Sequence, residues 1–134
     1  MTNTEEKILI IDQNHDERMV MASFLEKENY HVETGSSLID AIKKLSHNDF
    51  KCLVLDVDLP EMKGYEAIPI LKSIYPNLKV IMTTKKNTRE LEAKVREQDI
   101  FFYFIKSFKK EELKLAINNI FNKQRSTKNG KRQS

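Results

Sequence analysis

The chain has 134 residues, of which 40% are hydrophobic and 32% are charged, and its formal net charge is +3. This length fits one domain, and the apolar content is high enough for a folded core rather than a disordered chain. No stretch approaches the roughly 18 consecutive apolar residues that a membrane-spanning helix needs. Three glycines and three prolines exclude collagen-like and low-complexity classes.

The cysteine usage and the two ends of the chain predict its setting. Cys52 is the only cysteine, so no internal disulfide framework exists, and no His or Cys spacing is typical of zinc. Residues 1–6 are polar and acidic, unlike a secretory signal, which favours a reducing, cytoplasmic setting. Five basic residues and no acidic ones follow position 117. We expect residues 123–134 to be a basic, flexible tail, and the near-neutral body to offer no nucleic-acid footprint.

Four short apolar runs each end at a polar residue. They are residues 7–11 before Asp12, 52–55 before Asp56, 78–82 before Thr83-Thr84, and 101–105 before Lys106. Their length and their content of Ile, Val and Phe predict strands buried on both faces. A weaker, alternating run at residues 31–34 is typical of an edge strand.

Segments with helical spacing lie between these runs. Asn14 and Glu17 form a capping-box pattern at the start of the first segment. The apolar stripes are, in chain order, Met21, Phe24 and Leu25; Leu38, Ala41, Ile42 and Leu45; Ile68, Leu71 and Ile74; Leu91 and Val95; and Leu113, Ala116, Ile117 and Ile120. Pro69 falls about one turn into the third helix, which predicts a late start or a bend there.

Five strands that alternate with five helices predict an α/β fold, with a parallel sheet between two helix layers. In such a sheet, ligands bind beyond the carboxyl ends of the strands. Asp12, Asp56, Thr84 and Lys106 stand at four of these ends. Two neighbouring carboxylates favour a divalent cation, and hard oxygen donors favour Mg²⁺. Together with a hydroxyl and an ammonium, they suit a phosphoryl group, which an Asp carboxylate can accept as a nucleophile.

At these residues the sequence resembles the receiver domain of bacterial two-component response regulators, of the type found in the chemotaxis response regulator. The matching motifs are Ile8-Leu9-Ile10-Ile11-Asp12, Leu53 to Gly64 with its Pro-x-Met-x-Gly loop, Val80-Ile81-Met82-Thr83-Thr84, and Tyr103-Phe104-Ile105-Lys106-Ser107-Phe108. The resemblance covers residues 7 to about 123. It implies a flavodoxin-like sheet with strand order 2-1-3-4-5, and a receiver domain over residues 7–122 between an amino-terminal tail (1–6) and the basic tail.

The resemblance assigns a phosphoacceptor role to this domain. Asp56 would take a phosphoryl group from a sensor histidine kinase or a phosphotransfer protein, forming an aspartyl phosphate. Asp12, Asp56 and the backbone carbonyl of Asp58 would hold Mg²⁺. Thr84 would bond a phosphoryl oxygen, and Lys106 would pair with the phosphoryl charge. Such a domain is not a turnover enzyme, and it acts on a downstream output protein or domain.

The resemblance also implies a switch. Tyr103 would move inward as Thr84 shifts, altering the face formed by the fourth helix, the fifth strand and the fifth helix. From the residues alone, Tyr103 is equally a half-buried strand aromatic.

The sequence departs from the family pattern at three positions. Gln13 replaces the second of two adjacent acids, so we expect weaker Mg²⁺ binding, unless the Asp58 side chain supplies the charge. Ser107 replaces a proline, so we expect a trans Lys106–Ser107 bond, or a cis bond only under strain. Lys85 follows Thr84 where small residues are common, and it could reach the phosphoryl site, obstruct a kinase or point into water.

Two functions remain open at this point. In the first, the domain is a phosphorylatable switch; in the second, it is a degenerate receiver that binds proteins without phosphorylation. The complete acceptor loop after Asp56 favours the first, whereas Gln13 and Ser107 favour the second. We expect no membrane partner, and nucleic acid only through the basic tail. Homodimerisation stays open; Phe101 and Phe102 are expected to divide between core and surface, and an exposed one would favour an interface.

Overall fold

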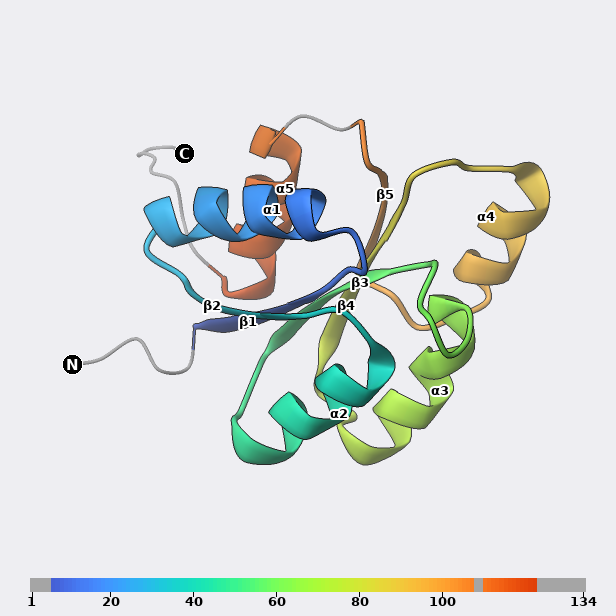
Figure 1. Cartoon of the computed structure of the whole chain (residues 1–134), viewed down its shortest axis with the longest axis horizontal. Helices are drawn as coiled ribbons and strands as arrows, with labels where there is room; N and C mark the ends of the chain where they lie inside the picture. The colour runs from blue at the N-terminus through green and yellow to red at the C-terminus, as the bar shows by residue number, and fades with distance from the viewer. Residues whose placement is uncertain (1–5, 108–109, 123–134) are drawn as a thin grey trace.

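Five parallel strands form one sheet in the order β2-β1-β3-β4-β5 (Figure 1). The computed structural model describes residues 6–107 and 110–122, so the predicted tails lie almost wholly outside the described residues. The strands are β1 (Lys7–Ile11), β2 (His31–Gly35), β3 (Cys52–Asp56), β4 (Lys79–Thr84) and β5 (Phe102–Ile105). The helices are α1 (His15–Lys27), α2 (Leu38–His47), α3 (Gly64–Ile74), α4 (Arg89–Arg96) and α5 (Lys110–Ile120). The predicted α/β fold and strand order are confirmed.

Two helix layers cover the sheet because successive strand residues point to opposite faces. Leu9 and Ile11 of β1 belong to the core cluster that includes residues of α2, α3 and α4. Ile8 and Ile10 belong to the other cluster, with residues of α1 and α5. In Figure 1, α1 and α5 accordingly lie on one side of the sheet, and α2 and α3 lie on the other. The central strands β1, β3 and β4 are therefore buried on both faces, as their apolar runs predict.

Side-chain caps start three of the helices, one of them at Asn14 as the sequence predicts. Asn14, Ser37 and Thr88 each accept a hydrogen bond from the backbone N–H three residues later, which satisfies a donor that the first helical turn leaves free. The capping box at α1 is only half formed. The backbone N–H of Asn14 donates to Asp12, and the Glu17 carboxylate accepts from Lys106 instead.

The predicted burial of side chains is wrong for several residues at the periphery of the fold. Ile42 is 43% exposed and Ile74 is 58% exposed, so each lies outside its helix's buried stripe. Phe101 and Phe102 are both exposed rather than divided between core and surface. The cause for β5 is its position, because an edge strand has a neighbour on one side only and its ends are exposed. β2, at the other edge, is partly exposed as expected.

Helix α3 contains Pro69 in its interior, and it begins at Gly64 rather than later. The prediction of a late start is therefore wrong. Because proline has no backbone N–H, the carbonyl of Tyr65 loses its usual helical partner, yet the helix continues to Ile74. Within the described residues, no helix is long and apolar enough to cross a membrane.

Gly64 links the start of α3 to the end of β3. Its backbone N–H donates to the carbonyl of Val57 at 2.5 Å, and a Cβ at this position would overlap the backbone carbonyl oxygen of Asp56 and the methyl group of Met82. We predict that Gly64→Ala lowers the free energy of unfolding by about 1–3 kcal/mol, because the overlap is with backbone that cannot move freely. Chemical denaturation measures this change, with Ser73→Ala in the last turn of the same helix as the control. A Gly64→Ala variant as stable as the control would contradict the close contact.

Candidate functional site

The carboxyl ends of β1 and β3 bring two carboxylates together. The two strands are neighbours, with Ile11 in register with Leu55, so Asp12 and Asp56 occupy adjacent positions at the same edge of the sheet. Both residues are buried, with exposed fractions of 1% and 4%. The chain passes from one side of the sheet to the other between β1 and β3, which is where ligands bind in sheets of this topology.

The Lys106 ammonium connects these carboxylates. It extends from the end of β5, and its Nζ lies 2.8 Å from Asp12 Oδ2 and 3.4 Å from Asp56 Oδ2. A third carboxylate, that of Glu17, lies 2.7 Å from the same nitrogen. An ammonium has three N–H donors, so all three have a carboxylate within ion-pair distance. The structure thus brings together three of the four residues predicted from the strand ends, and it adds Glu17.

The Asp56 carboxylate is held in an environment that disfavours its charge. Burial and the neighbouring charge of Asp12 raise its pKa from an ordinary 3.8 to about 6, and the Lys106 ammonium only partly opposes them. The pKa of Lys106 is raised: burial lowers it, but the close contacts with the Asp12 and Glu17 carboxylates and the charge of Asp56 outweigh burial. The arrangement is a desolvated anionic pair with one close cation.

The oxygen atoms of Asp12 and Asp56 fit a hard divalent cation. Asp12 Oδ1 accepts from the backbone N–H of Asn14 at 2.9 Å. Asp12 Oδ2 is buried and has no hydrogen bond of good geometry in the described structure, although the Lys106 ammonium lies close to it. Mg²⁺ is bound in proteins by one or two carboxylates plus water, and these two side chains meet that need. No cluster of three or more Asp, Glu, His or Cys side chains suited to a metal occurs within residues 6–107 and 110–122.

Asp58 is engaged on both its backbone and its side chain. Its carbonyl oxygen accepts a hydrogen bond from Gln13 Nε2 at 2.9 Å, and its carboxylate pairs with the Lys63 ammonium at 2.7 Å. The amide at position 13 therefore binds the oxygen that the family resemblance assigns to Mg²⁺. The Asp58 side chain is paired with Lys63, so its expected contribution of charge to the metal site gains no support from this geometry.

Thr84 and Tyr103 lie beside the pocket on β4 and β5. Thr84 is buried, and its hydroxyl donates to the carbonyl of Lys86 at 3.2 Å. Tyr103 is half-buried against the core, and its hydroxyl donates to Asn87 Oδ1 at 2.5 Å. Its pKa is raised by burial and by the negative charge of Glu92. Both residues thus contact the segment that joins β4 to α4.

Tyr103 belongs to a closed set of contacts, which we call the Asn87 circuit and define as Asn87, Glu92, Arg96 and Tyr103. Asn87 Nδ2 donates to Glu92 Oε1 at 3.0 Å, and Glu92 Oε2 accepts from Arg96 Nε at 3.2 Å. The Arg96 guanidinium lies 5.8 Å from the centre of the Tyr103 ring, at cation–π distance. The circuit joins the loop before α4, the helix itself and β5.

The structure tests the prediction at Ser107, and it shows the exposure of Lys85. No cis peptide bond occurs among the described residues, so the Lys106–Ser107 bond is trans, as predicted. Lys85 is exposed, and its role at the site stays a prediction.

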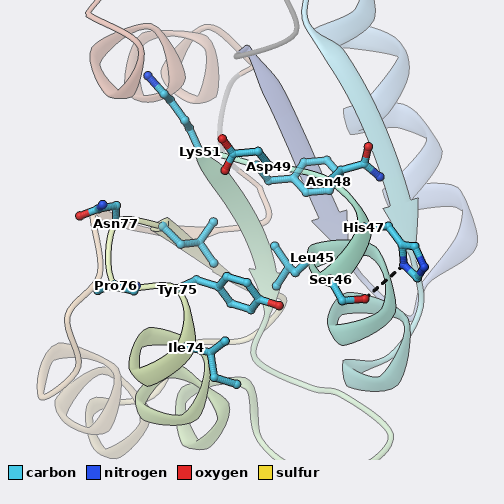
Figure 2. Close-up of a pocket in the computed structure, with 12 residues that line it drawn as sticks. Leu45, Ser46, His47, Asn48, Asp49, Lys51, Ile74, Tyr75, Pro76 and Asn77 are labelled. Carbon is cyan, nitrogen blue, oxygen red and sulfur yellow. Dashed lines mark hydrogen bonds between the residues drawn. The ribbon is translucent and has the colours of Figure 1, made fainter.

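A separate hollow of about 590 Å³ lies at the amino ends of β3 and β4. Figure 2 shows the residues that line it. It lies between the end of α2, the residues before β3 and the turn that joins α3 to β4, and Asp49 is the one carboxylate among its described lining residues. Ser46 and His47 contact each other at 3.1 Å. This hollow lacks the paired carboxylates and the buried ammonium that characterise the Asp56 pocket.

Glu17 and Asn87 are the residues that the sequence analysis missed. Glu17 was interpreted as part of the capping box at the start of the first helix, which is the usual role of such a side chain, and Asn87 was assigned no role at the site. The signal that could have identified Glu17 is its place in the first turn after Asp12, at the same edge of the sheet as Lys106. Asn87 gives no comparable signal, because its contact with Tyr103 depends on how the loop before α4 folds.

Comparison with known proteins identifies the family. The model of the response regulator receiver domain matches residues 8–118, so this chain belongs to the receiver domain family of two-component response regulators. The transcriptional regulatory protein SrrA of Staphylococcus aureus is 26% identical over 121 residues, which cover 90% of this chain and 50% of SrrA. The chain therefore spans about half the length of the curated relatives that it matches.

Solved structures agree with this assignment. The beryllofluoride-activated receiver domain dimer of NtrC4 superposes with a TM-score of 0.82 at 27% identity, covering 87% of this chain and 97% of that one. The beryllofluoride-activated receiver domain of DrrB gives 0.79 at 25% identity, covering 89% and 99%. A CheY-like receiver domain protein from Methanospirillum hungatei has the same fold, with a TM-score of 0.78 at 23% identity, covering 88% and 98%. Receiver domains are signalling modules rather than turnover enzymes, and they typically bind Mg²⁺.

The raised pKa of Asp56 gives the first prediction at this site. Above about pH 6 the folded state carries an Asp56 charge that it disfavours, and this cost disappears as the pH falls from 6 toward the unfolded-state pKa. Asp56→Asn should therefore raise the free energy of unfolding at pH 7.5 by on the order of 2–3 kcal/mol, and the gain should vanish near pH 4. Urea denaturation across this range measures it.

The control for this prediction is Asp49→Asn, at an exposed carboxylate in the hollow at the opposite end of the sheet. It removes the same charge from a solvated position, so it should change the stability little at any pH. An Asp56→Asn variant that is less stable than the wild type at pH 7.5 would show that the attraction of Lys106 for the Asp56 carboxylate outweighs the costs of its burial and of its repulsion by Asp12.

Proposed function

We propose that this chain is a phosphorylatable receiver in which Asp56 accepts a phosphoryl group from a phosphohistidine of a sensor kinase or phosphotransfer protein. The observation that carries the proposal is the position of the Asp56 carboxylate, beside Asp12 and within 3.4 Å of the Lys106 ammonium. A carboxylate Oδ–P bond forms as the P–N bond of the phosphohistidine breaks, and the imidazole keeps the electron pair. The pocket's task is to hold the carboxylate, the phosphoryl charge and the cations in position.

Each site residue has a part in this step. Asp12, Asp56 and the carbonyl of Asp58 would hold Mg²⁺, which when bound neutralises charge on the carboxylates and on the phosphoryl oxygens. Lys106 already lies against Asp56, so it can pair with the phosphoryl group there. The Thr84 hydroxyl can exchange its backbone acceptor at Lys86 for a phosphoryl oxygen, because a hydroxyl rotates freely to a new acceptor.

This exchange of the Thr84 hydrogen bond would also affect the output face. Thr84 lies two residues before Lys86, whose carbonyl it contacts. It lies three residues before Asn87, which accepts a hydrogen bond from the Tyr103 hydroxyl. We propose that phosphorylation shifts this segment, changes the Tyr103 environment and alters the α4–β5–α5 face for a downstream output protein or domain. Exposed apolar side chains support this face as an interface; they are Phe101, Phe102, Ile105 and Leu115. A hollow of about 630 Å³ on this face is lined by Phe101, by residues of β5 and α5, and by Arg96 of α4.

One observation favours the alternative function, a receiver that binds partners without phosphorylation. The Gln13 side chain occupies the Asp58 carbonyl, and it supplies no charge where the family has a second acid. A site with weak Mg²⁺ affinity would be phosphorylated slowly. The two functions share the fold and the α4–β5–α5 face, so they are separated only by the chemistry at Asp56.

Intact-mass measurement distinguishes the phosphorylatable receiver from the receiver that binds partners without phosphorylation. After incubation with Mg²⁺ and acetyl phosphate, we predict that the wild-type chain gains the mass of one phosphoryl group and that Asp56→Asn gains none. The gain should be lost when a chelator removes Mg²⁺, because the carboxylates then lack their cation. A wild-type chain without the gain, or an Asp56→Asn variant with it, would rule out the phosphorylatable receiver with Asp56 as acceptor.

The Gln13→Asp variant tests whether the neutral side chain at position 13 limits the Mg²⁺ affinity of the site. The substitution adds a carboxylate beside Asp12 and removes the amide that contacts the Asp58 carbonyl, so Mg²⁺ should bind about three- to tenfold more tightly, as expected for one added charge at a partly solvated site. Calorimetric titration with Mg²⁺ measures the dissociation constant. Ser23→Asp adds the same charge on the exposed side of α1 and should leave it unchanged. If Gln13→Asp binds no better than the wild type, the amide is not what limits the site.

A further inference from the structure

Glu17 contacts the site without belonging to any set of residues that the family resemblance assigns. It lies in the first turn of α1, with 31% of its side chain exposed, and its Oε1 lies 2.7 Å from Lys106 Nζ. This is the shortest of three ion-pair distances to that ammonium, the others being 2.8 Å to Asp12 and 3.4 Å to Asp56. The ammonium is therefore nearer to the α1 side of the pocket than to the acceptor carboxylate.

The Glu17 carboxylate has no capping duty that would explain this position. In a capping box it would accept from the backbone N–H of the cap residue, but the N–H of Asn14 donates to Asp12 Oδ1. The backbone N–H of Glu17 is itself capped by Asn14 Oδ1 at 2.9 Å. The N–H groups of Asn14 and Glu17 are thus satisfied without the Glu17 side chain, whose carboxylate accepts from Lys106 instead.

The charges in the pocket explain what this contact does. Asp12 and Asp56 carry two buried negative charges, and an ammonium that paired fully with them would compete with any divalent cation for the same oxygens. Glu17 takes part of the ammonium's hydrogen-bonding capacity and balances its charge. Because Gln13 is neutral, the pocket gains its third carboxylate from α1 rather than from position 13.

We infer that Glu17 is a positioning residue, which holds Lys106 on the α1 side of the pocket so that the Asp56 carboxylate stays available to Mg²⁺. The inference deepens the proposed phosphoacceptor function and rests on it for its biological purpose. Its physical content, the coupling of Glu17 to the metal affinity through Lys106, does not require phosphorylation. Without the Glu17 charge, the ammonium shifts onto Asp56 and the metal must displace it.

Calorimetric titration with Mg²⁺ tests this inference on four folded chains. We predict that Glu17→Gln weakens Mg²⁺ binding about three- to tenfold relative to the wild type, as expected for one charge at a partly solvated site. Glu17→Asp keeps the charge but shortens the side chain by one methylene, so it should resemble Glu17→Gln if contact with Lys106 is what matters. Asp16→Asn removes a charge from the neighbouring exposed position and should stay within about twofold of the wild type.

The outcomes separate the inference from its alternatives. If Glu17→Asp binds Mg²⁺ as the wild type does while Glu17→Gln does not, Glu17 acts through its charge alone and the positioning role is wrong. Equal affinities for the wild type and Glu17→Gln, or a wild-type chain that binds no Mg²⁺, also overturn it. Thermal melting of each variant confirms that the chains compared are folded.

Acetyl phosphate labelling of the same wild-type sample keeps the two proposals distinct. A wild-type chain that binds Mg²⁺ through a Glu17-dependent site but gains no phosphoryl mass would refute the phosphoacceptor function and leave the positioning role intact. A chain that is labelled at Asp56, with Mg²⁺ affinity independent of Glu17, would do the reverse.

Discussion

The closeness of two buried carboxylates is the electrostatic constraint around which the pocket is organised. Asp12 and Asp56 follow adjacent strands in register, so the sheet itself forces them together, and burial removes the water that would screen their repulsion. Lys106 relieves part of this repulsion, and the remainder appears as the raised pKa of Asp56. This buried anionic pair favours a bound cation or neutralisation of Asp56. Stability and the proposed phosphoacceptor function are therefore opposed at this one edge of the sheet.

The fold was predictable because its main signal is local. Apolar runs that end at Asp12, Asp56, Thr84 and Lys106 define strands by their length and composition, and the alternation with helices leaves few arrangements of the sheet. The exposure of β5 was not predictable in the same way. Phe101 and Phe102 were expected to divide between core and surface, whereas both are exposed; their burial depends on how far the flanking helices extend over the edge of the sheet, which no local pattern encodes.

The site was predictable in its strand-end residues but not in its contacts. Parallel strands place their carboxyl ends together, so Asp12, Asp56 and Lys106 could be assigned to one pocket before the structure was known. Which partner each long side chain selects depends on distances of a few tenths of an ångström. The contacts of Glu17 with Lys106 and of Gln13 with the Asp58 carbonyl are of this kind, and together they distinguish this pocket from the family pattern.

The Asn87 circuit links the movements of the three elements from which its residues come. Its members come from a loop, a helix and an edge strand, and each holds the next by a directional contact. Glu92 and Arg96 lie four residues apart on one face of α4, so a rotation of the helix about its own axis would carry both away from Asn87 and the Tyr103 ring and break contacts to each. The circuit therefore couples a movement of α4 to β5 and to the loop that follows Thr84.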